Sequence, residues 1–287
     1  MLPTGETHMG VLGGSGLHSA WGMRVWEARV GLVAGHGPDL PLDLRRQLLE
    51  SGVDLSGVWE YPEPTARAWQ IFEFDQHRTE LFRTPEADFY RRLPTAENIP
   101  PAYWDAAGFH LLQGPAEALA LAQALRRRDR AVLLAEPPPG AYTPARLPEF
   151  ARLLPAVDVF SPNLEEAGAL LEEDDPARLA ARFLEMGAAV VALRMGAAGS
   201  LVAQAKTGES WRIPAYPARV VDVTGAGNSY CGGFLVGYVT TGDPLLAGRM
   251  AAVSASFTVE QFGLPPLSPG VEAEARRRLT NRSSAGR

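Results

Sequence analysis

The residues best suited to chemistry in this chain form a turn of small side chains between an apolar run, 218–223, and a helical segment that starts near residue 228. The turn consists of Thr224, Gly225, Ala226, Gly227 and Asn228. The first N–H groups of a helix have no intrahelical acceptor, and the helix dipole adds partial positive charge there. Glycine also lets a phosphate approach the backbone closely. The pattern predicts an anion site, although a turn kept small only for packing would look the same.

Asn163 and Glu166 form a second candidate pair, at the start of a helix that follows the apolar run 157–162. Residues three apart share a helix face. An amide and a carboxylate suit Mg²⁺, which keeps several waters and binds through a few oxygens plus substrate phosphates. A helix N-cap with an acidic first turn would use the same residues, so both interpretations stay open.

Two further glycine turns lie at strand or helix ends. Gly196 and Gly199 stand between two apolar runs, where a tight turn would direct backbone donors at a phosphate. Gly13 and Gly14 precede a helical segment that carries His18, and this loop could hold sugar hydroxyls. Taken alone, each is also typical of an ordinary turn.

Apolar runs of strand length alternate with helical segments through the C-terminal two thirds of the chain. The expected strands are 109–113, 131–137, 157–162, 189–194, 200–205 and 218–223, and the expected helices are 115–128, 144–154 and 163–187. Strands separated by helices predict a parallel sheet with helices on both faces. The short glycine turn between the strands 189–194 and 200–205 predicts a hairpin. The expected fold class is α/β, a three-layer α/β/α sandwich with a mostly parallel sheet.

The first third of the chain is less regular, with a strand at 28–34 followed by a helix from Leu42. Residues 69–83 alternate apolar and polar side chains around a polar turn, which predicts a two-stranded hairpin with one apolar face. Such a hairpin would be a small β lid, or else an extension of the sheet edge. We expect residues 1–267 to form one domain that includes the lid, and residues 268–287 to form a C-terminal helix and a disordered tail.

Composition narrows the class of protein. The chain has 287 residues, a formal net charge of -6 and 46% hydrophobic residues, a balance that does not indicate a nucleic-acid binder. No apolar stretch is long enough to predict a membrane span. The single cysteine, Cys231, lies in an apolar run and is expected to be a core residue, and a cytoplasmic location fits.

Together, the order, spacing and strand-end placement of the four motifs resemble the PfkB, or ribokinase-like, carbohydrate kinase family, from about Val11 to Gly263. The most specific mark is the run from Asp222 to Gly227 followed by a helix of small residues. The segment 133–168 is similar to the branch with the fungal maintenance-of-killer proteins, which tends to carry Asn after the glycine motif. The resemblance implies a ribokinase-like sandwich and ATP-dependent phosphoryl transfer to a hydroxyl of a small sugar-like or nucleoside-like substrate.

The resemblance also implies a role for each motif. The N–H groups of Gly225, Ala226 and Gly227 would form the anion hole for the transferring phosphoryl. The nucleotide side would be lined by Asn163, Glu166, Arg194, Gly196 and Gly199, with residues 251–262 as an adenine wall. Asn163 and Glu166 would organise Mg²⁺ indirectly.

The substrate side would comprise Gly13, Gly14 and His18, and a monovalent cation such as K⁺ would bind at Asp222 and Thr224. The implied cofactors are thus ATP, Mg²⁺ and in some members K⁺. The implied partner is a small-molecule substrate, with a homodimer through the lid as a further hypothesis.

The chain departs from the family at several positions. Asn228 stands where members place an Asp as general base, and an amide accepts no proton at neutral pH. His18 stands where Asn is usual, and Arg194 where Lys is common. The family's first strand, which usually supplies a substrate-binding Asp, is expected to lack a counterpart here.

Three hypotheses follow: an active kinase with weakened base catalysis, a catalytically inactive nucleotide or metabolite binder, and a fold relative with different chemistry. General base catalysis contributes about 10²–10⁴-fold, so Asn228→Asp is expected to raise phosphoryl transfer about 10-fold or more. If Asn228 merely caps the helix, the substitution changes nothing kinetic.

Overall fold

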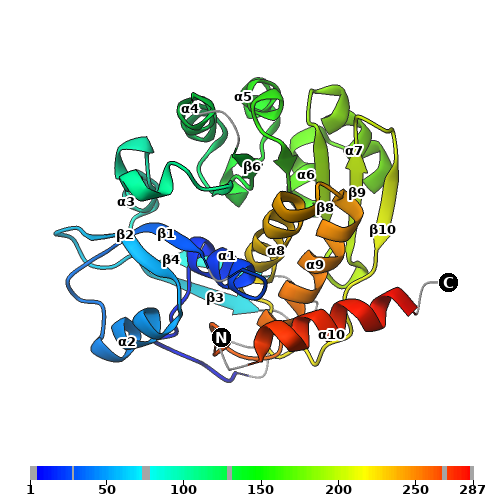
Figure 1. Ribbon diagram of the computed structural model, residues 1–287. Helices are drawn as coiled ribbons and strands as arrows, with labels where there is room; N and C mark the ends of the chain where they lie inside the picture. Colours follow the sequence, from blue (N-terminus) through cyan, green and yellow to red (C-terminus); the bar gives the residue numbers. More distant parts are fainter. Residues whose placement is uncertain (1–4, 28, 73–77, 128–130, 267–269, 285–287) are drawn as a thin grey trace.

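The computed structural model describes residues 5–27, 29–72, 78–127, 131–266 and 270–284 (Figure 1). The strands are β1 (Gly31–His36), β2 (Asp54–Glu60), β3 (Ala68–Phe72), β4 (Arg78–Phe82), β5 (Gly108–Leu111), β6 (Val132–Ala135), β7 (Val159–Phe160), β8 (Val190–Arg194), β9 (Ser200–Gln204) and β10 (Ser210–Ile213). The α-helices are α1 (Ser15–Arg24), α2 (Leu42–Glu50), α3 (Glu86–Arg91), α4 (Pro115–Arg126), α5 (Leu147–Leu153), α6 (Leu164–Leu171), α7 (Pro176–Glu185), α8 (Ala226–Thr241), α9 (Pro244–Thr258) and α10 (Val271–Ser284).

A six-stranded sheet in the order β10-β9-β8-β7-β6-β5 forms the centre of the molecule. The pairs from β5 to β8 are parallel, while β8–β9 and β9–β10 are antiparallel. The mostly parallel sheet and the hairpin between β8 and β9 are therefore confirmed.

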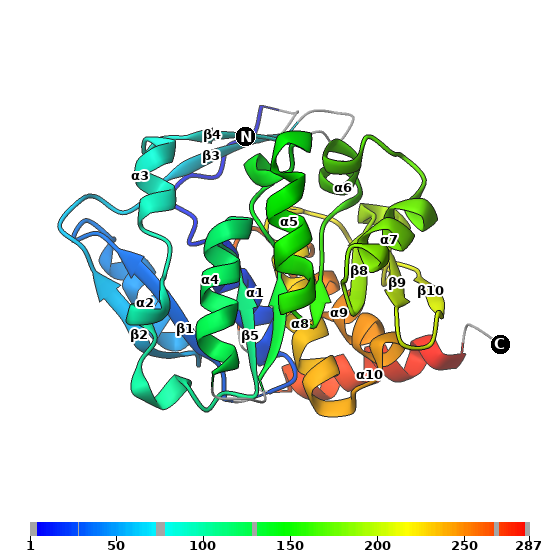
Figure 2. The same cartoon turned by 90° about the horizontal axis from the view of Figure 1, so that it is seen from above.

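Both faces of this sheet are buried, because successive side chains of a strand point to opposite sides. Leu133 packs in the cluster with α4, α5, α6 and α7, whereas Leu134 packs in the cluster with α8 and α9. Val191 and Val190 divide in the same way. Figure 1 shows α4 and α5 on one side of the sheet and α8 and α9 on the other, and Figure 2 looks down onto the α4–α5 side, which confirms the three-layer sandwich.

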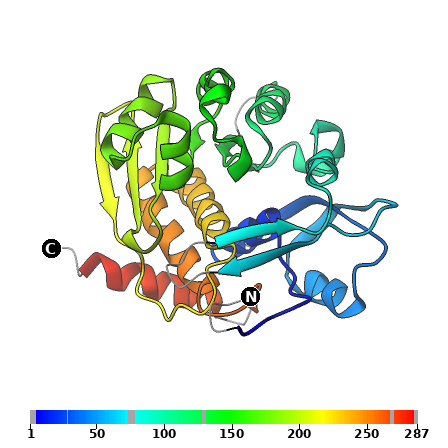
Figure 3. The same ribbon diagram turned by 180° about the vertical axis from the view of Figure 1, so that it is seen from behind.

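Two smaller strand pairs lie outside the six-stranded sheet. β1 and β2 pair in parallel, and β3 and β4 form an antiparallel pair from Ala68↔Phe82 to Phe72↔Arg78. Figure 3 shows the β3–β4 pair standing apart from the main sheet. The hairpin is confirmed and its interpretation as a sheet-edge extension is wrong; its turn, residues 73–77, lies outside the described residues.

Residues 218–223 are not a strand, contrary to the prediction. Val221 N donates to the Val259 carbonyl at 2.7 Å, just after α9, instead of to a strand, and Val220 is 64% exposed, so this segment joins no sheet and does not pack in the core. The strand in this part of the chain is β10, whose short sequence SWRI gave no clear pattern.

The segment 163–187 is two helices rather than one. α6 ends at Glu172 in the left-handed conformation, and Asp175 caps α7 with Pro176 in its first turn. The tail was expected to be disordered from residue 280, but α10 continues to Ser284. No helix among the described residues combines the length and apolar character needed to span a membrane.

The helix that carries the glycine turn is held against α1 by close backbone contact. A Cβ atom on Gly22 would collide with the Ser229 carbonyl, and one on Gly232 would collide with the Ser19 carbonyl. This packing places the start of α1, with His18, beside the start of α8.

Candidate active site

A single large cavity of about 2310 Å³ collects most of the residues singled out by the sequence. It is lined on one side by the lid residues Gln70, Glu80 and Phe82. Its other walls include Gly14, His18, Asn163, Glu166, Arg194, Gly196, Gly199, Thr224, Gly225, Ala226, Gly227 and Asn228. Gly13 and Asp222 are not among the lining residues.

The turn before α8 has the geometry of an anion site. Gly225 is the N-cap, with φ 77°, a conformation that favours glycine. Ala226 N–H donates to the Val223 carbonyl at 3.2 Å, so it is already engaged. Gly227 and Asn228 lie in the first helical turn, where backbone N–H groups have no intrahelical acceptor. An anion bound at this turn would therefore be held by these two donors rather than by Ala226.

Arg194, at the end of β8, lies directly against this turn. A Cβ atom on Gly227 would collide with the Arg194 Nη1 atom, which explains why glycine is needed there. The guanidinium is 12% exposed and donates through Nη2 to the Ser161 carbonyl at 2.9 Å. A fixed positive charge thus lies beside the N-terminus of α8 and adds to its attraction for an anion.

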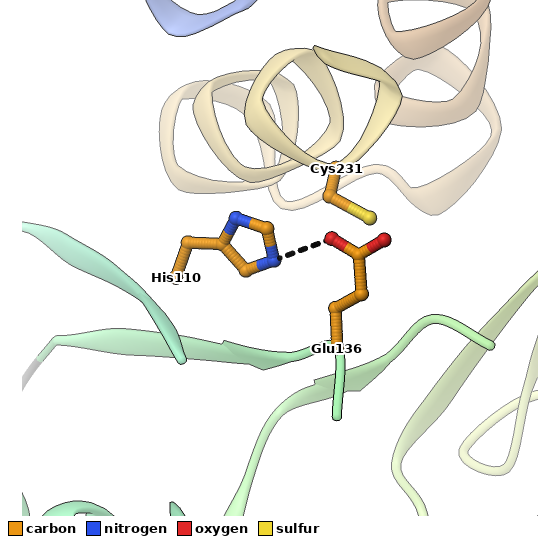
Figure 4. A group of neighbouring side chains, drawn as sticks. All are labelled: His110, Glu136 and Cys231. Carbon is orange, nitrogen blue, oxygen red and sulfur yellow. Dashed lines mark ion pairs between the residues drawn. The ribbon is translucent and has the colours of Figure 1, made fainter. Parts of the chain in front are cut away.

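Glu136, just after β6, is the buried carboxylate that neutralises this arginine. Its Oε1 lies 2.7 Å from Arg194 Nη1, and its Oε2 lies 3.1 Å from His110 Nε2 (Figure 4). Burial alone would raise the pKa of Glu136, but Arg194, His110 and Asn228 together lower that pKa to about 2. Glu136 is therefore ionised at neutral pH.

Asn228 belongs to the same network. Its Nδ2 donates to Glu136 Oε2 at 3.0 Å, which fixes the orientation of the amide. A carboxylate at position 228 would stand against a second carboxylate. The single substitution Asn228→Asp is therefore not expected to add a working base. Asn228 and Glu136 would have to be exchanged together, so that only one carboxylate is present.

Cys231 lies beside Glu136 and His110, and the three ligand atoms are within 4.8 Å of one another (Figure 4). The Arg194 guanidinium at 2.7 Å from the carboxylate opposes a cation at this place. Burial raises the pKa of Cys231, so the thiol is not ionised. The cluster is suited to a charge network rather than a metal site, and Cys231, fully buried, is a core residue as predicted.

Asn163 and Glu166 form a reciprocal capping box at the start of α6. Asn163 Oδ1 accepts from Glu166 N at 2.7 Å, and Glu166 Oε2 accepts from Asn163 N at 2.8 Å. Glu166 Oε2 also lies 3.4 Å from Arg194 Nη2. The capping interpretation is thus confirmed, and any contact of these oxygens with Mg²⁺ would run through water.

The expected nucleotide wall is assembled from β8 and α9. Gly196 and Gly199 both have positive φ, 56° and 88°, and a Cβ on Gly199 would collide with the Ile213 carbonyl. Ala252 and Ala255 of α9 line the same cavity. Small residues on both sides leave a slot with apolar walls.

His18 occupies the place where the glycine loop meets the anion turn. The imidazole is 2% exposed, and a Cβ on Gly225 would collide with it. Its Nδ1 lies 3.0 Å from the Gly14 carbonyl, and Gly14, with φ 106°, is the N-cap of α1. Burial lowers the pKa of His18, against smaller opposing effects of the Gly14 hydrogen bond and Asp222.

Asp222 and Thr224 lie in one short turn, in which Thr224 N donates to Asp222 Oδ1 at 2.9 Å. Only Thr224 lines the cavity.

Glu136 and His110 were missed by sequence reasoning. Each is a polar side chain within an apolar parallel strand or at its carboxyl end, and α/β proteins bind ligands at that end. This feature could have identified both residues. Nothing in the sequence indicates that Glu136 contacts Asn228, because the two lie 92 residues apart.

Comparisons with known proteins identify the family of this chain. The pfkB family carbohydrate kinase model matches residues 6–269. The cytidine kinase of Thermococcus kodakarensis is 31% identical over 227 residues, covering 76% of each protein. Protein MAK32 of Saccharomyces cerevisiae is 26% identical over 263 residues, covering 83% of this chain and 72% of that protein. The nucleoside kinase structure of Methanocaldococcus jannaschii superposes with a TM-score of 0.72 at 24% identity, covering 94% of this chain and 87% of that one.

The chain belongs to the pfkB family of carbohydrate kinases and has its ribokinase-like fold. The predicted resemblance, including the maintenance-of-killer branch, is confirmed. Membership places the chain in a family of carbohydrate kinases, which are transferases, and its curated relatives include a cytidine kinase.

Proposed function

We propose that this protein transfers the γ-phosphoryl group of ATP to a hydroxyl of a nucleoside-like substrate. The observation that carries the proposal is the first turn of α8, which faces the same cavity as the lid and the glycine loop. Phe82, Tyr103 and Phe109 line the substrate side of this cavity, and aromatic walls suit a flat base.

Each part of the site has a role in such a transfer. The N–H groups of Gly227 and Asn228, backed by Arg194, would stabilise charge on the transferring phosphoryl, which passes through a loose transition state. Mg²⁺ supplies charge neutralisation at the nucleotide phosphates when bound. Asn163 and Glu166 would hold it through water, since Asn163 Oδ1 and Glu166 Oε2 each already accept a backbone N–H.

The proposed site also includes a monovalent cation and the β3–β4 lid. Asp222 and Thr224 would bind a monovalent cation such as K⁺, for which a carboxylate and a hydroxyl are suitable oxygen donors. The β3–β4 lid would close over the substrate through Gln70 and Glu80 and exclude water from the reaction.

A second candidate function is nucleotide or metabolite binding without catalysis. It is favoured by the hydrogen bond from Asn228 to Glu136, which places an amide where a base is usual. The two candidates share nucleotide binding and differ in turnover.

Isothermal titration calorimetry with Mg-ATP and Mg-ADP tests what they share. Gly196→Val should abolish the binding heat, because the side chain would project from the nucleotide wall. Gly208→Val is the matched control: Gly208 also has positive φ, 71°, and open space around it, yet lies outside the cavity lining. The proposal fails if the unmodified protein gives no heat, or if both variants bind equally.

A further inference from the structure

Phosphoryl transfer to a hydroxyl releases a proton, and neither the Asn228 amide nor the Glu136 carboxylate is free to take it. Asn228 is an amide whose Nδ2 is committed to Glu136. Glu136 in turn contacts Arg194, Asn228 and His110, and that environment favours its ionised form. The inference that follows rests on the proposed function and names the group that receives this proton.

His18 is a titratable side chain that lies directly against the anion turn and lines the cavity, whereas Asp222, just before the turn, does not line it. Its ring lies between the two glycine segments: a Cβ on Gly225 would collide with Cδ2 and Cγ, and one on Gly13 would lie 3.4 Å from Cε1. The ring therefore occupies the junction of the substrate loop and the phosphoryl site, and it lines the cavity.

The hydrogen bonding of His18 fixes its tautomer. Nδ1 lies 3.0 Å from the Gly14 carbonyl, which can only accept, so Nδ1 carries the hydrogen. Nε2 then presents its lone pair. This atom is buried and has no hydrogen-bond partner among the described residues. A buried acceptor left unpaired costs about 1–3 kcal/mol, which indicates that a ligand supplies the missing donor.

The electrostatic surroundings suit a base. Burial lowers the pKa of His18, so the imidazole is neutral near pH 7. The Gly14 carbonyl and the nearby Asp222 carboxylate oppose this shift and would stabilise the imidazolium once it forms.

We propose that His18 Nε2 is the general base of this kinase and takes the place of the carboxylate that is missing at position 228. The substrate O–H bond breaks and its proton moves to Nε2. The same oxygen forms a bond to the γ-phosphorus of ATP, and the bond from that phosphorus to the bridging oxygen breaks, releasing ADP. The imidazolium then returns its proton to water.

Steady-state kinetics of His18→Asn tests this role on the substrate that the protein phosphorylates. Asn keeps a donor for the Gly14 carbonyl but accepts no proton. The expected result is a fall in kcat of about 10²-fold or more with little change in KM, and loss of the acidic limb of the pH–rate profile. His36→Asn is the matched control, because His36 Nδ1 also bonds a backbone carbonyl, at 2.8 Å from Gly37 O, but lies outside the cavity lining.

The opposite outcomes overturn the assignment. A kcat within about threefold of the unmodified protein, an unchanged pH profile, or an effect on KM alone would show that His18 only positions the loop. If the unmodified protein phosphorylates no acceptor, the proposed function itself fails; if it does and His18→Asn is equally active, only this inference fails.

A second measurement does not depend on a folded variant. The chain has five histidines, so ¹⁵N NMR can resolve the Nε2 signal of His18 in the unmodified protein. Adding the substrate with a non-hydrolysable Mg-ATP analogue should shift that signal toward a hydrogen-bonded acceptor. An unshifted Nε2 signal in the saturated complex would overturn the proposal.

Discussion

Exchanging Asn228 for Asp should destabilise the folded protein, because the new carboxylate faces Glu136. The amide nitrogen that it replaces lies 3.0 Å from Glu136 Oε2. At an effective dielectric constant near 20, two like charges at that distance repel by about 5 kcal/mol. The pair can avoid this repulsion if one carboxyl keeps its proton, which costs about 4 kcal/mol at pH 7. This cost sets an upper limit on the loss of unfolding free energy. With compensation from Arg194, we expect Asn228→Asp to lose roughly 2–4 kcal/mol of unfolding free energy at pH 7.

The pH dependence identifies the cause. The shared proton raises one folded carboxyl pKa above its unfolded value near 4. A group whose pKa is raised on folding contributes stability at a pH below its unfolded pKa, and this contribution is lost as the pH rises. The difference in unfolding free energy between Asn228→Asp and the unmodified protein should therefore be small near pH 4 and grow toward pH 7. Urea unfolding across this range, followed by circular dichroism, measures it.

The double variant Asn228→Asp/Glu136→Gln is the control, because it exchanges the amide and the carboxylate and so removes the repulsion between two carboxylates. It should recover most of the stability, with a coupling energy of about 2–3 kcal/mol in the double-mutant cycle. It should also show the gain of phosphoryl transfer that the sequence alone assigned to the single change. A single variant as stable as the unmodified protein at pH 7, with no pH-dependent deficit, would refute this account of the network.

Three further outcomes are expected. Gly227→Ala should displace Arg194 and cost about 1–3 kcal/mol with weaker Mg-ADP binding by calorimetry, whereas Gly242→Ala, at an open position, should leave binding intact. Glu136 has a folded pKa of about 2 against an ordinary 4.5, so its stabilisation is present above pH 4.5 and is lost as the pH falls toward 2. Glu136→Gln should therefore flatten the acid loss of stability in urea titrations; an unchanged slope would contradict the ion pair. Gly22→Ala should lower the melting temperature by several degrees, because its methyl group collides with α8, and an unchanged transition would refute that contact.

Periodicity predicted the main sheet well, because strands buried on both faces show as continuous apolar runs such as 131–135 and 189–193. It failed at β2 and β10, most of whose residues are half-buried or exposed, and at 218–223, where apolar residues lie outside the core. The local sequence pattern cannot predict whether a segment is buried, because burial depends on which other elements pack against it.

Some residues of the candidate site could likewise be predicted from the sequence, and others could not. Glycine turns and the Asn163–Glu166 pair could be found from sequence, since their conformation is local. The contacts of Glu136 with Arg194 and Asn228 could not, because they join residues far apart in the chain through the order of the strands. For the same reason, the sequence placed His18 on the substrate side but not against Gly225.

Phosphorylation of an acceptor by the purified protein is the most direct test of the proposed kinase activity. Purified protein incubated with Mg-ATP and a panel of nucleosides and sugars can be analysed by mass spectrometry for ADP and phosphorylated acceptors. We predict that a nucleoside gains one phosphoryl group with an equal amount of ADP formed, that Gly196→Val abolishes this, and that Gly208→Val does not. Formation of no phosphorylated acceptor, by a protein that binds Mg-ATP and a nucleoside, would contradict the kinase assignment and favour a binding protein.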